Sequence, residues 1–178
     1  MKLVILDRDG VINEDSPHYI KSSHEWHPIK GSLEAIAELN QLGFTVAVAT
    51  NQSGIARRMY DEVTLKNIHE KMHRAVNAVG GKIDSIFYCP HGPDDNCDCR
   101  KPKPGLLQQI AKHYEIDLGN VSCVGDSYRD LQAASHAGAT PVLVLTGNGR
   151  KTLQTHAKDL QKIAYYVDLF AFVRSLEA

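Results

Sequence analysis

The sequence predicts an α/β protein, a Rossmann-like three-layer sandwich in which helices cover both faces of a central, mostly parallel sheet. Two observations predict it. Short apolar runs recur along the chain and end at acidic, amide, thiol or glycine residues, as strands buried on both faces do. Segments with apolar residues at helical spacing separate these runs, and such β–α alternation is typical of parallel sheets.

The first half of the chain alternates strand, helix, strand and helix. The apolar run 3–6 predicts the first strand, which a long polar connection follows. Ser32 is a suitable N-cap for the first helix, which Gly43 ends. The apolar run 44–49 predicts the second strand. The clearest helical stripe spans 62–79 and stops at two consecutive glycines.

The second half continues this pattern. Further strands are expected at the apolar runs 83–89, 121–124, 141–145 and 165–167. Pro104 suits the first turn of a helix, another helix ends near Ala137, and a last helix begins at Leu169. No connection is long enough for a separate cap domain, so we expect a single domain over residues 1–178.

Composition narrows the class of protein. The chain has 20 Lys and Arg against 21 Asp and Glu, and this balance leaves no basic excess for nucleic acid or an anionic membrane. No apolar run approaches the roughly 18 residues of a membrane span. Six residues precede the first acidic residue, too few for a signal-peptide core. We therefore expect a cytoplasmic monomer whose partner is a small molecule.

Acidic and hydroxyl side chains follow the predicted strands. Ligands of parallel sheets bind beyond the carboxyl ends of the strands. Asp7 and Asp9 follow the first strand, Thr50 the second and Asp126 the fourth. Clustered carboxylates repel one another unless a cation offsets them, and Mg²⁺ is the hard divalent ion expected here. The Thr50 hydroxyl and the Lys101 ammonium supply what phosphate chemistry requires.

Four motifs in this order resemble those of the haloacid dehalogenase-like phosphatases. They are Asp7-Arg8-Asp9-Gly10, Thr50, Lys101, and Gly125-Asp126-Ser127-Tyr128-Arg129-Asp130 with its G-D-x-x-x-D spacing. The resemblance covers about residues 3–150 and implies hydrolysis of a phosphate monoester through an aspartyl-phosphate. For the lysine that contacts the phosphoryl group, the resemblance favours Lys101 over Lys103, because the family pattern does not specify a residue at the position of Lys103.

The resemblance also implies a role for each residue. Asp7 would attack the phosphorus, and Asp9 would protonate the leaving alkoxide and then activate the hydrolytic water. Thr50 and Lys101 would hold the phosphoryl group. The Mg²⁺ ligands would be the side chains of Asp7 and Asp126 with the backbone carbonyl of Asp9.

A second constellation lies in the loop 89–101. Its ligand-type residues are Cys89, His91, Cys97 and Cys99, with the spacing C-x-H-x₅-C-x-C. Three thiolates and one imidazole are the usual content of a structural zinc site, and four protein ligands leave no open position for catalysis. We therefore expect Zn²⁺ to fix the loop that carries Arg100 and Lys101.

This zinc loop resembles that of two branches of the family. One acts on a heptose 1,7-bisphosphate in bacterial heptose (lipopolysaccharide core) biosynthesis, and the other on histidinol phosphate. Ser53, where the histidinol branch tends to have Asp, favours the heptose branch. There Arg100 would bind the distal phosphate, which suits a guanidinium fork. The expected substrate-binding residues are Asp15, His18, Tyr19, Asn51, Ser53, Arg100 and Ser127.

Two alternatives stay open, as does the anomer of the heptose. A histidinol-phosphate phosphatase or another small phosphomonoesterase would use the same motifs on a different substrate. A non-enzymatic phospho-acceptor signalling domain shares a sheet with an acid, a Thr and a Lys, but its acceptor should follow the third strand, where this chain has Cys89. His69 and His73, four residues apart on a predicted helix, are interpreted as surface residues.

Overall fold

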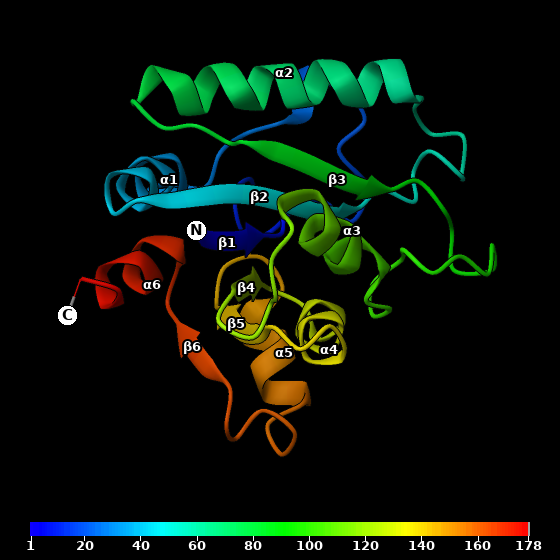
Figure 1. Cartoon of the computed structure of the whole chain (residues 1–178). Coiled ribbons are helices and arrows are strands. Elements are labelled where there is room, and N and C mark those ends of the chain that lie inside the picture. The colour runs from blue at the N-terminus through cyan, green and yellow to red at the C-terminus, as the bar shows by residue number, and fades with distance from the viewer. Residues whose placement is uncertain (178) are drawn as a thin grey trace.

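Six parallel strands form one sheet in the order β3-β2-β1-β4-β5-β6 (Figure 1). The computed structural model describes residues 1–177. The strands are β1 (Lys2–Leu6), β2 (Phe44–Asn51), β3 (Ser85–Cys89), β4 (Ser122–Gly125), β5 (Thr140–Val144) and β6 (Ala164–Tyr166). Each follows a predicted apolar run to within two residues, so the predicted fold class is confirmed.

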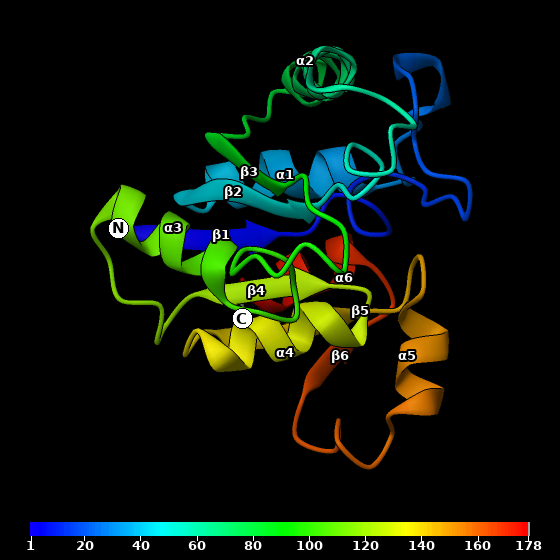
Figure 2. The same cartoon turned by 90° about the vertical axis from the view of Figure 1, so that its right-hand side faces the viewer.

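Helices connect consecutive strands and cover both faces of the sheet (Figures 1 and 2). They are α1 (Ser32–Gln41), α2 (Glu62–Ala78), α3 (Gly105–Tyr114), α4 (Tyr128–His136), α5 (Gly149–Thr155) and α6 (Leu169–Ser175), with a 3₁₀ turn η1 (Ser23–Glu25). α1 and α6 pack on one face, and α3 and α4 on the other. Among residues 1–177 no connection holds a cap domain.

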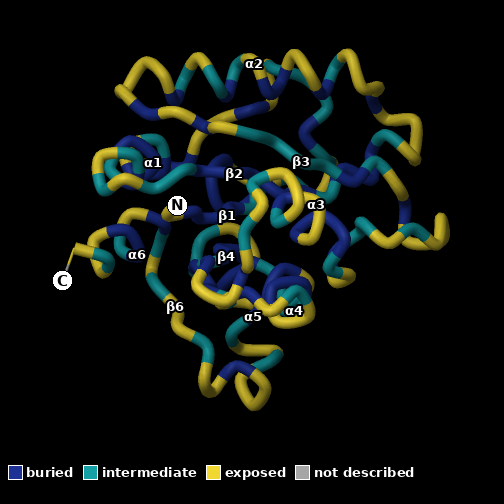
Figure 3. The backbone as a smooth tube through the Cα atoms, viewed as in Figure 1, coloured by how far each residue is buried: buried dark blue, intermediate teal, exposed yellow. Residues whose placement is uncertain are grey.

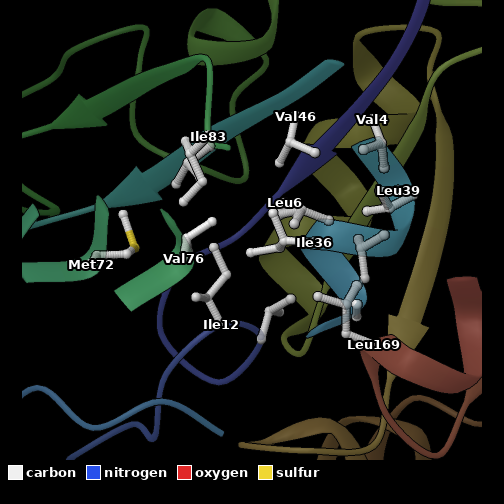
Figure 4. Packing of buried hydrophobic residues seen from close by; sticks show 14 of the residues in the cluster. Val4, Leu6, Ile12, Ile36, Leu39, Val46, Met72, Val76, Ile83 and Leu169 are labelled. Carbon is white, nitrogen blue, oxygen red and sulfur yellow. The ribbon is translucent and has the colours of Figure 1, made fainter. Parts of the chain in front are cut away.

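Strand β1 shows how the sheet serves two hydrophobic cores. Val4 and Leu6 belong to the cluster under α1 and α6, whereas Leu3 and Ile5 belong to the cluster under α3 and α4. The first cluster also takes in the apolar stripe of α2, including Met72 (Figure 4). Buried positions follow the central strands, and exposed positions lie on the outer sides of the helices (Figure 3). The sheet is therefore the middle layer of three.

The structure departs from the sequence prediction at two helix starts. Ser32 is the first residue of α1 and not its N-cap, because Gly31 takes the cap position with a φ of 87°. The Ser32 hydroxyl instead donates to the Val11 carbonyl at 2.7 Å. No pattern predicts α5, since its seven residues bury only Gly149 and Thr152 and carry no apolar stripe.

The two histidines of α2 differ in burial. His69 is 8% exposed, so its interpretation as a surface residue is wrong. Its Nε2 lies 3.2 Å from Nη1 of Arg8, and the Arg8 side chain is fully buried. His73, one turn further along α2, is partly exposed. Packing against a residue distant in sequence therefore buries one member of a pair that looks equivalent in the sequence.

The strand order reverses between β1 and β4, because the chain first builds outward to β3 and then returns to the other side of β1. In sheets of this order, the crevice beyond the carboxyl ends at the reversal is the usual ligand site. Asp7 and Asp126 directly follow these two strands. Within residues 1–177, no helix has the length and apolar character that crossing a bilayer requires.

Candidate active site

A pocket of about 280 Å³ opens at the carboxyl ends of β1, β2 and β4. The expected residues that line it are Asp7, Asp9, Asp15, Tyr19, Thr50, Asn51, Ser53, Arg100, Lys101, Asp126 and Ser127. His18, which is also expected to bind substrate, does not line the pocket in this structure. The Ser16 hydroxyl accepts the His18 N–H at 3.1 Å, in a turn that leaves the imidazole exposed.

Three carboxylates meet in this pocket. Asp7, Asp126 and Asp130 each place an oxygen within 4.8 Å of the others. Gly10 and Gly147 have φ values of 82° and 55°, and a Cβ atom on either would overlap the Asp126 carboxylate. Burial and the neighbouring Asp130 raise the pKa of Asp7 to about 7 and that of Asp126 to about 9. The positive charge near these three carboxylates is therefore too small to keep all of them ionised.

Lys101 offsets part of the negative charge. Its Nζ lies 3.1 Å from Oδ1 of Asp7 and 2.7 Å from Oδ1 of Asp130, and it donates to a backbone carbonyl of β2 at 2.8 Å. Burial lowers the pKa of Lys101, but the charges of Asp130 and Asp7 together raise it by more, so the net shift is upward. Lys103 is exposed and donates to a backbone carbonyl within the loop 89–101. Of the two lysines, Lys101 reaches the acids.

The donor set fits one hard divalent cation. Both carboxylate oxygens of Asp130 already have partners, so neither is a suitable metal ligand. Oδ1 faces Lys101, and Oδ2 accepts from the Asp126 N–H and from both the N–H and the hydroxyl of Ser127. Within residues 1–177, Oδ2 of Asp7 and Oδ1 of Asp126 accept no hydrogen bond. Such carboxylate oxygens, together with a backbone carbonyl and waters, are ligands that Mg²⁺ takes.

Three side chains outside the expected set hold the Asp9 carboxylate. Arg8 donates to Oδ1 from Nε at 3.0 Å and from Nη2 at 2.7 Å. Asn13 donates to the same oxygen at 2.9 Å. Gln52 Nε2 donates to Oδ2 at 3.0 Å and to the Thr50 hydroxyl at 2.9 Å. Arg8 lies inside the first motif and Gln52 lies two residues after Thr50. A fully buried arginine is rare, so sequence reasoning treats Arg8 as solvated.

The Cys and His residues of the loop 89–101 form one cluster. Its ligand atoms are Sγ of Cys89, Nδ1 of His91, Sγ of Cys97 and Sγ of Cys99, all within 4.8 Å of one another. Four of the separations lie between 3.0 and 3.7 Å. Thiolates about 2.3 Å from one tetrahedral zinc ion lie about 3.8 Å apart. The donor chemistry and the spacing of the cluster therefore fit Zn²⁺.

The loop 89–101 leaves the sheet and returns to it at the same place. It starts at Cys89, which pairs with Asn51 in the β2–β3 ladder and whose carbonyl accepts the Gln52 N–H at 2.8 Å. It ends at Lys101, whose N–H donates to Asn51 Oδ1 at 3.0 Å and whose carbonyl accepts from Asn51 Nδ2 at 3.1 Å. Gln52 therefore holds the start of the loop and Asn51 its end, which keeps Lys101 beside the acids.

Known proteins share this sequence over most of its length. Residues 98–171 match the profile of a family described as HAD-hydrolase-like. The D-glycero-beta-D-manno-heptose-1,7-bisphosphate 7-phosphatase of Bordetella bronchiseptica is 61% identical over 153 residues, which are 86% of each chain. The protein of the same name in Pseudomonas putida is 56% identical over 176 residues, or 99% of each chain. The chain belongs to this heptose 1,7-bisphosphate 7-phosphatase family.

Solved structures of the heptose 1,7-bisphosphate 7-phosphatase family share the whole fold. The D,D-heptose 1,7-bisphosphate phosphatase of B. bronchiseptica, crystallised with magnesium and phosphate, aligns over 100% of both chains with a TM-score of 0.96 and 55% identity. The enzyme from Burkholderia thailandensis aligns over 100% of this chain and 99% of its own, with a TM-score of 0.77 and 43% identity. The family fold therefore extends over all of this chain.

The mouth of the pocket is basic in this member of the heptose bisphosphate phosphatase family. Arg57, Arg100 and Arg129 all line it. Burial and the nearby Arg129 and Arg57 lower the pKa of Arg100, so the three guanidinium groups repel one another. Asp15 accepts a hydrogen bond from Asn148 Nδ2 at 3.1 Å on the same pocket wall. Arg129 occupies a variable position of the G-D-x-x-x-D motif. Neither it nor Arg57 or Asn148 belongs to the expected set of site residues.

Proposed function

We propose that this protein removes the 7-phosphate of D-glycero-β-D-manno-heptose 1,7-bisphosphate by Mg²⁺-dependent hydrolysis. The observation that carries the proposal is the convergence of Asp7, Asp9, Thr50 and Lys101 in one pocket at the carboxyl end of β1. The names of the relatives support the heptose substrate and its β anomer. The product would then enter heptose biosynthesis for the lipopolysaccharide core.

The proposed reaction has two steps. A carboxylate oxygen of Asp7 bonds to phosphorus, the bond from phosphorus to the sugar oxygen breaks, and Asp9 gives its proton to that oxygen. Asp9 then takes a proton from water as the water attacks phosphorus, which frees Asp7 and releases inorganic phosphate. Thr50 and Lys101 hold the phosphoryl oxygens throughout, and the Lys101 ammonium offsets the charge that develops on them.

Magnesium would be held by the side chains of Asp7 and Asp126 and by the backbone carbonyl of Asp9. The raised pKa values of both carboxyl groups support this assignment, because a divalent cation would restore their ionised form. The B. bronchiseptica relative, which was crystallised with magnesium and phosphate, supports it as well. When bound, the ion neutralises negative charge on the phosphoryl group.

Zinc would have a structural role in the loop 89–101. The Cys₃His set leaves no open coordination position, so this ion would bind no substrate. Burial and the neighbouring Cys99 raise the pKa of the Cys89 thiol to about 12. A bound cation would therefore be needed to keep this thiol ionised. The loop would then hold Arg100 at the pocket mouth.

The distal phosphate would lie at the basic mouth of the pocket. Arg100 is the proposed main ligand, because its guanidinium can make two parallel hydrogen bonds to phosphate. The proposed contacts to the rest of the sugar are Asp15, Tyr19, Asn51 and Ser53, which line the same pocket. Ser127 is less available, since its hydroxyl donates to Asp130 at 2.8 Å. We further propose that the protein is a monomer and acts in the cytoplasm. Light scattering tests the monomeric state.

Phosphate release distinguishes this proposal from its alternatives. The assay offers both anomers of heptose 1,7-bisphosphate and histidinol phosphate with Mg²⁺, to the wild-type protein and to Asp7→Asn. We expect release from the β-heptose substrate, and none from Asp7→Asn. Release from histidinol phosphate alone would move the activity to that branch. A stable aspartyl-phosphate without release would favour the phospho-acceptor signalling domain.

A further inference from the structure

His69 of α2 contacts a residue that belongs to the first catalytic motif. α2 lies on the β3 side of the sheet in both views (Figures 1 and 2), and none of the motifs described above lies on it. Yet His69 Nε2 lies 3.2 Å from Nη1 of Arg8, and both side chains are buried. Arg8 in turn forms an ion pair with Asp9 at 2.7 Å. A chain of three side chains thus joins α2 to the proposed general acid.

The chemistry of the pair fixes the state of the imidazole. A guanidinium group has five donors and no acceptor, so His69 Nε2 accepts the hydrogen bond from Arg8. The ring is therefore neutral and carries its proton on Nδ1. Burial and the Arg8 charge lower the pKa of His69 to about 3, which agrees with this state. Asp9, His73 and Tyr88 are the other titratable groups beside the ring, and the Tyr88 ring lies edge-on to it with the centroids 6.5 Å apart. Glu62, Lys66 and Glu70 of α2 line the same surface hollow as His69.

The hydrogen bonds to Asp9 make its two carboxylate oxygens unequal. Oδ1 accepts three donors: Nε and Nη2 of Arg8, and Nδ2 of Asn13. Oδ2 accepts one, from Gln52 Nε2 at 3.0 Å. The Tyr60 hydroxyl donates to Gln52 Oε1, which leaves the amide nitrogen directed at Asp9. A carboxylate oxygen with three donors has no lone pair for a further proton, so Oδ2 is the oxygen that can carry one.

We propose that His69 is a positioning residue, which holds Arg8 so that Asp9 presents Oδ2 to the oxygen of the leaving group. Asp9 lines the pocket and its side chain is 22% exposed, whereas Arg8 and His69 are closed off from it. In the step concerned, Asp7 bonds to phosphorus, the bond from phosphorus to the sugar oxygen breaks, and the proton moves from Oδ2 of Asp9 to that oxygen. The inference rests on the proposed function.

The dependence of the rate on the leaving group tests this role. A sugar alkoxide needs a proton as it departs, whereas p-nitrophenolate is stable without one. The value of kcat/KM covers the reaction only up to the departure of the leaving group. The ratio of kcat/KM for the two substrates therefore isolates the proton transfer. It also cancels the fraction of folded enzyme, so a variant that folds poorly still gives a valid result.

Three variants make the comparison. His69→Phe keeps the ring shape and removes the acceptor, and His69→Gln restores an acceptor. His73→Phe changes a histidine of the same helix that does not contact Arg8. Because a small misplacement of a catalytic group costs up to about 100-fold, we expect His69→Phe to lower kcat/KM for heptose 1,7-bisphosphate at least about tenfold. The value for p-nitrophenyl phosphate should change less than about twofold, and His69→Gln and His73→Phe should stay near wild type.

Equal losses on both substrates would overturn the proposal, because a purely structural defect lowers both alike. No loss on the sugar substrate would overturn it as well. Glycerol phosphate is also an alkyl ester, so it can replace heptose 1,7-bisphosphate in the comparison with p-nitrophenyl phosphate. A failure of the wild-type protein on the heptose substrate would therefore count against the function proposed above and not against the role of His69.

Discussion

His69 makes the folded protein sensitive to acid in a way that one substitution should remove. His69 is 8% exposed, and burial together with Arg8 lowers its pKa to about 3, from the ordinary value of 6.5. Between these values the unfolded chain binds a proton that the folded chain does not. The free energy of unfolding therefore falls as the pH is lowered below about 6.5. At about pH 5 the loss from this one group, relative to about pH 8, is about 2 kcal/mol.

The magnitude depends little on the exact pKa of the folded protein. At about pH 5 the folded ring is neutral for any pKa well below that pH, so the unfolded value sets the result. For a chain of this length, about 2 kcal/mol corresponds to about 4–8 °C in Tm. The variant His69→Gln removes the titrating group and keeps an acceptor for Arg8.

Urea unfolding at the two pH values measures the effect. We expect the pH-dependent loss of unfolding free energy to be about 2 kcal/mol smaller in His69→Gln than in the wild-type protein. His73→Gln is the matched control on the same helix. Contributions from carboxyl groups and from the Cys₃His cluster are common to all three proteins and cancel in the difference. Identical pH dependence in wild type and His69→Gln would show that the folded ring takes up the proton, which refutes the reasoning.

Three further predictions concern the active site. Gly10→Ala, which drives a Cβ into the Asp126 carboxylate, should lower Mg²⁺-dependent kcat by about 100-fold; Gly43→Ala, also at positive φ but in open space, should keep it, and equal activities would contradict the packing argument. Cys99→Ser should lose about one zinc per chain in metal analysis and lower the Tm; unchanged zinc content would exclude Cys99 as a ligand. Arg100→Lys should raise KM for heptose 1,7-bisphosphate about tenfold, because an ammonium cannot make the paired hydrogen bonds of a guanidinium. The same variant should leave kcat/KM for p-nitrophenyl phosphate within about twofold, and equal changes for both substrates would argue against a distal-phosphate contact.

Much of the site can be predicted from the sequence, because the ends of the apolar runs mark the ends of the strands. Asp7, Thr50 and Asp126 each follow an apolar run, and parallel strands bring their carboxyl ends to one edge of the sheet. The motif spacing then adds Lys101 from a loop. These predictions need no knowledge of side-chain contacts, and the pocket contains all four residues.

The supporting contacts could not be predicted, because they join segments whose proximity depends on packing. Arg8 and His69 are 61 residues apart, and nothing in the α2 pattern distinguishes His69 from His73. Arg57 and Arg129 likewise line the pocket, although the sequence predicts a role for neither of them. His18 lies outside the lining of the pocket for a related reason, since a local turn decides which side chains of the connection after β1 reach the pocket.

The double attachment of the loop 89–101 has a consequence for how this protein can evolve. Gln52 and Asn51 hold the two ends of the loop, and the Cys₃His cluster joins the segments on either side of residues 92–96, so Lys101 does not depend on those five side chains. Insertions or exchanges around residues 92–96 can then reshape the entrance without moving the chemistry. The entrance and the catalytic residues are thus held by separate contacts, so the entrance can change in sequence while Lys101 keeps its place beside Asp7 and Asp130.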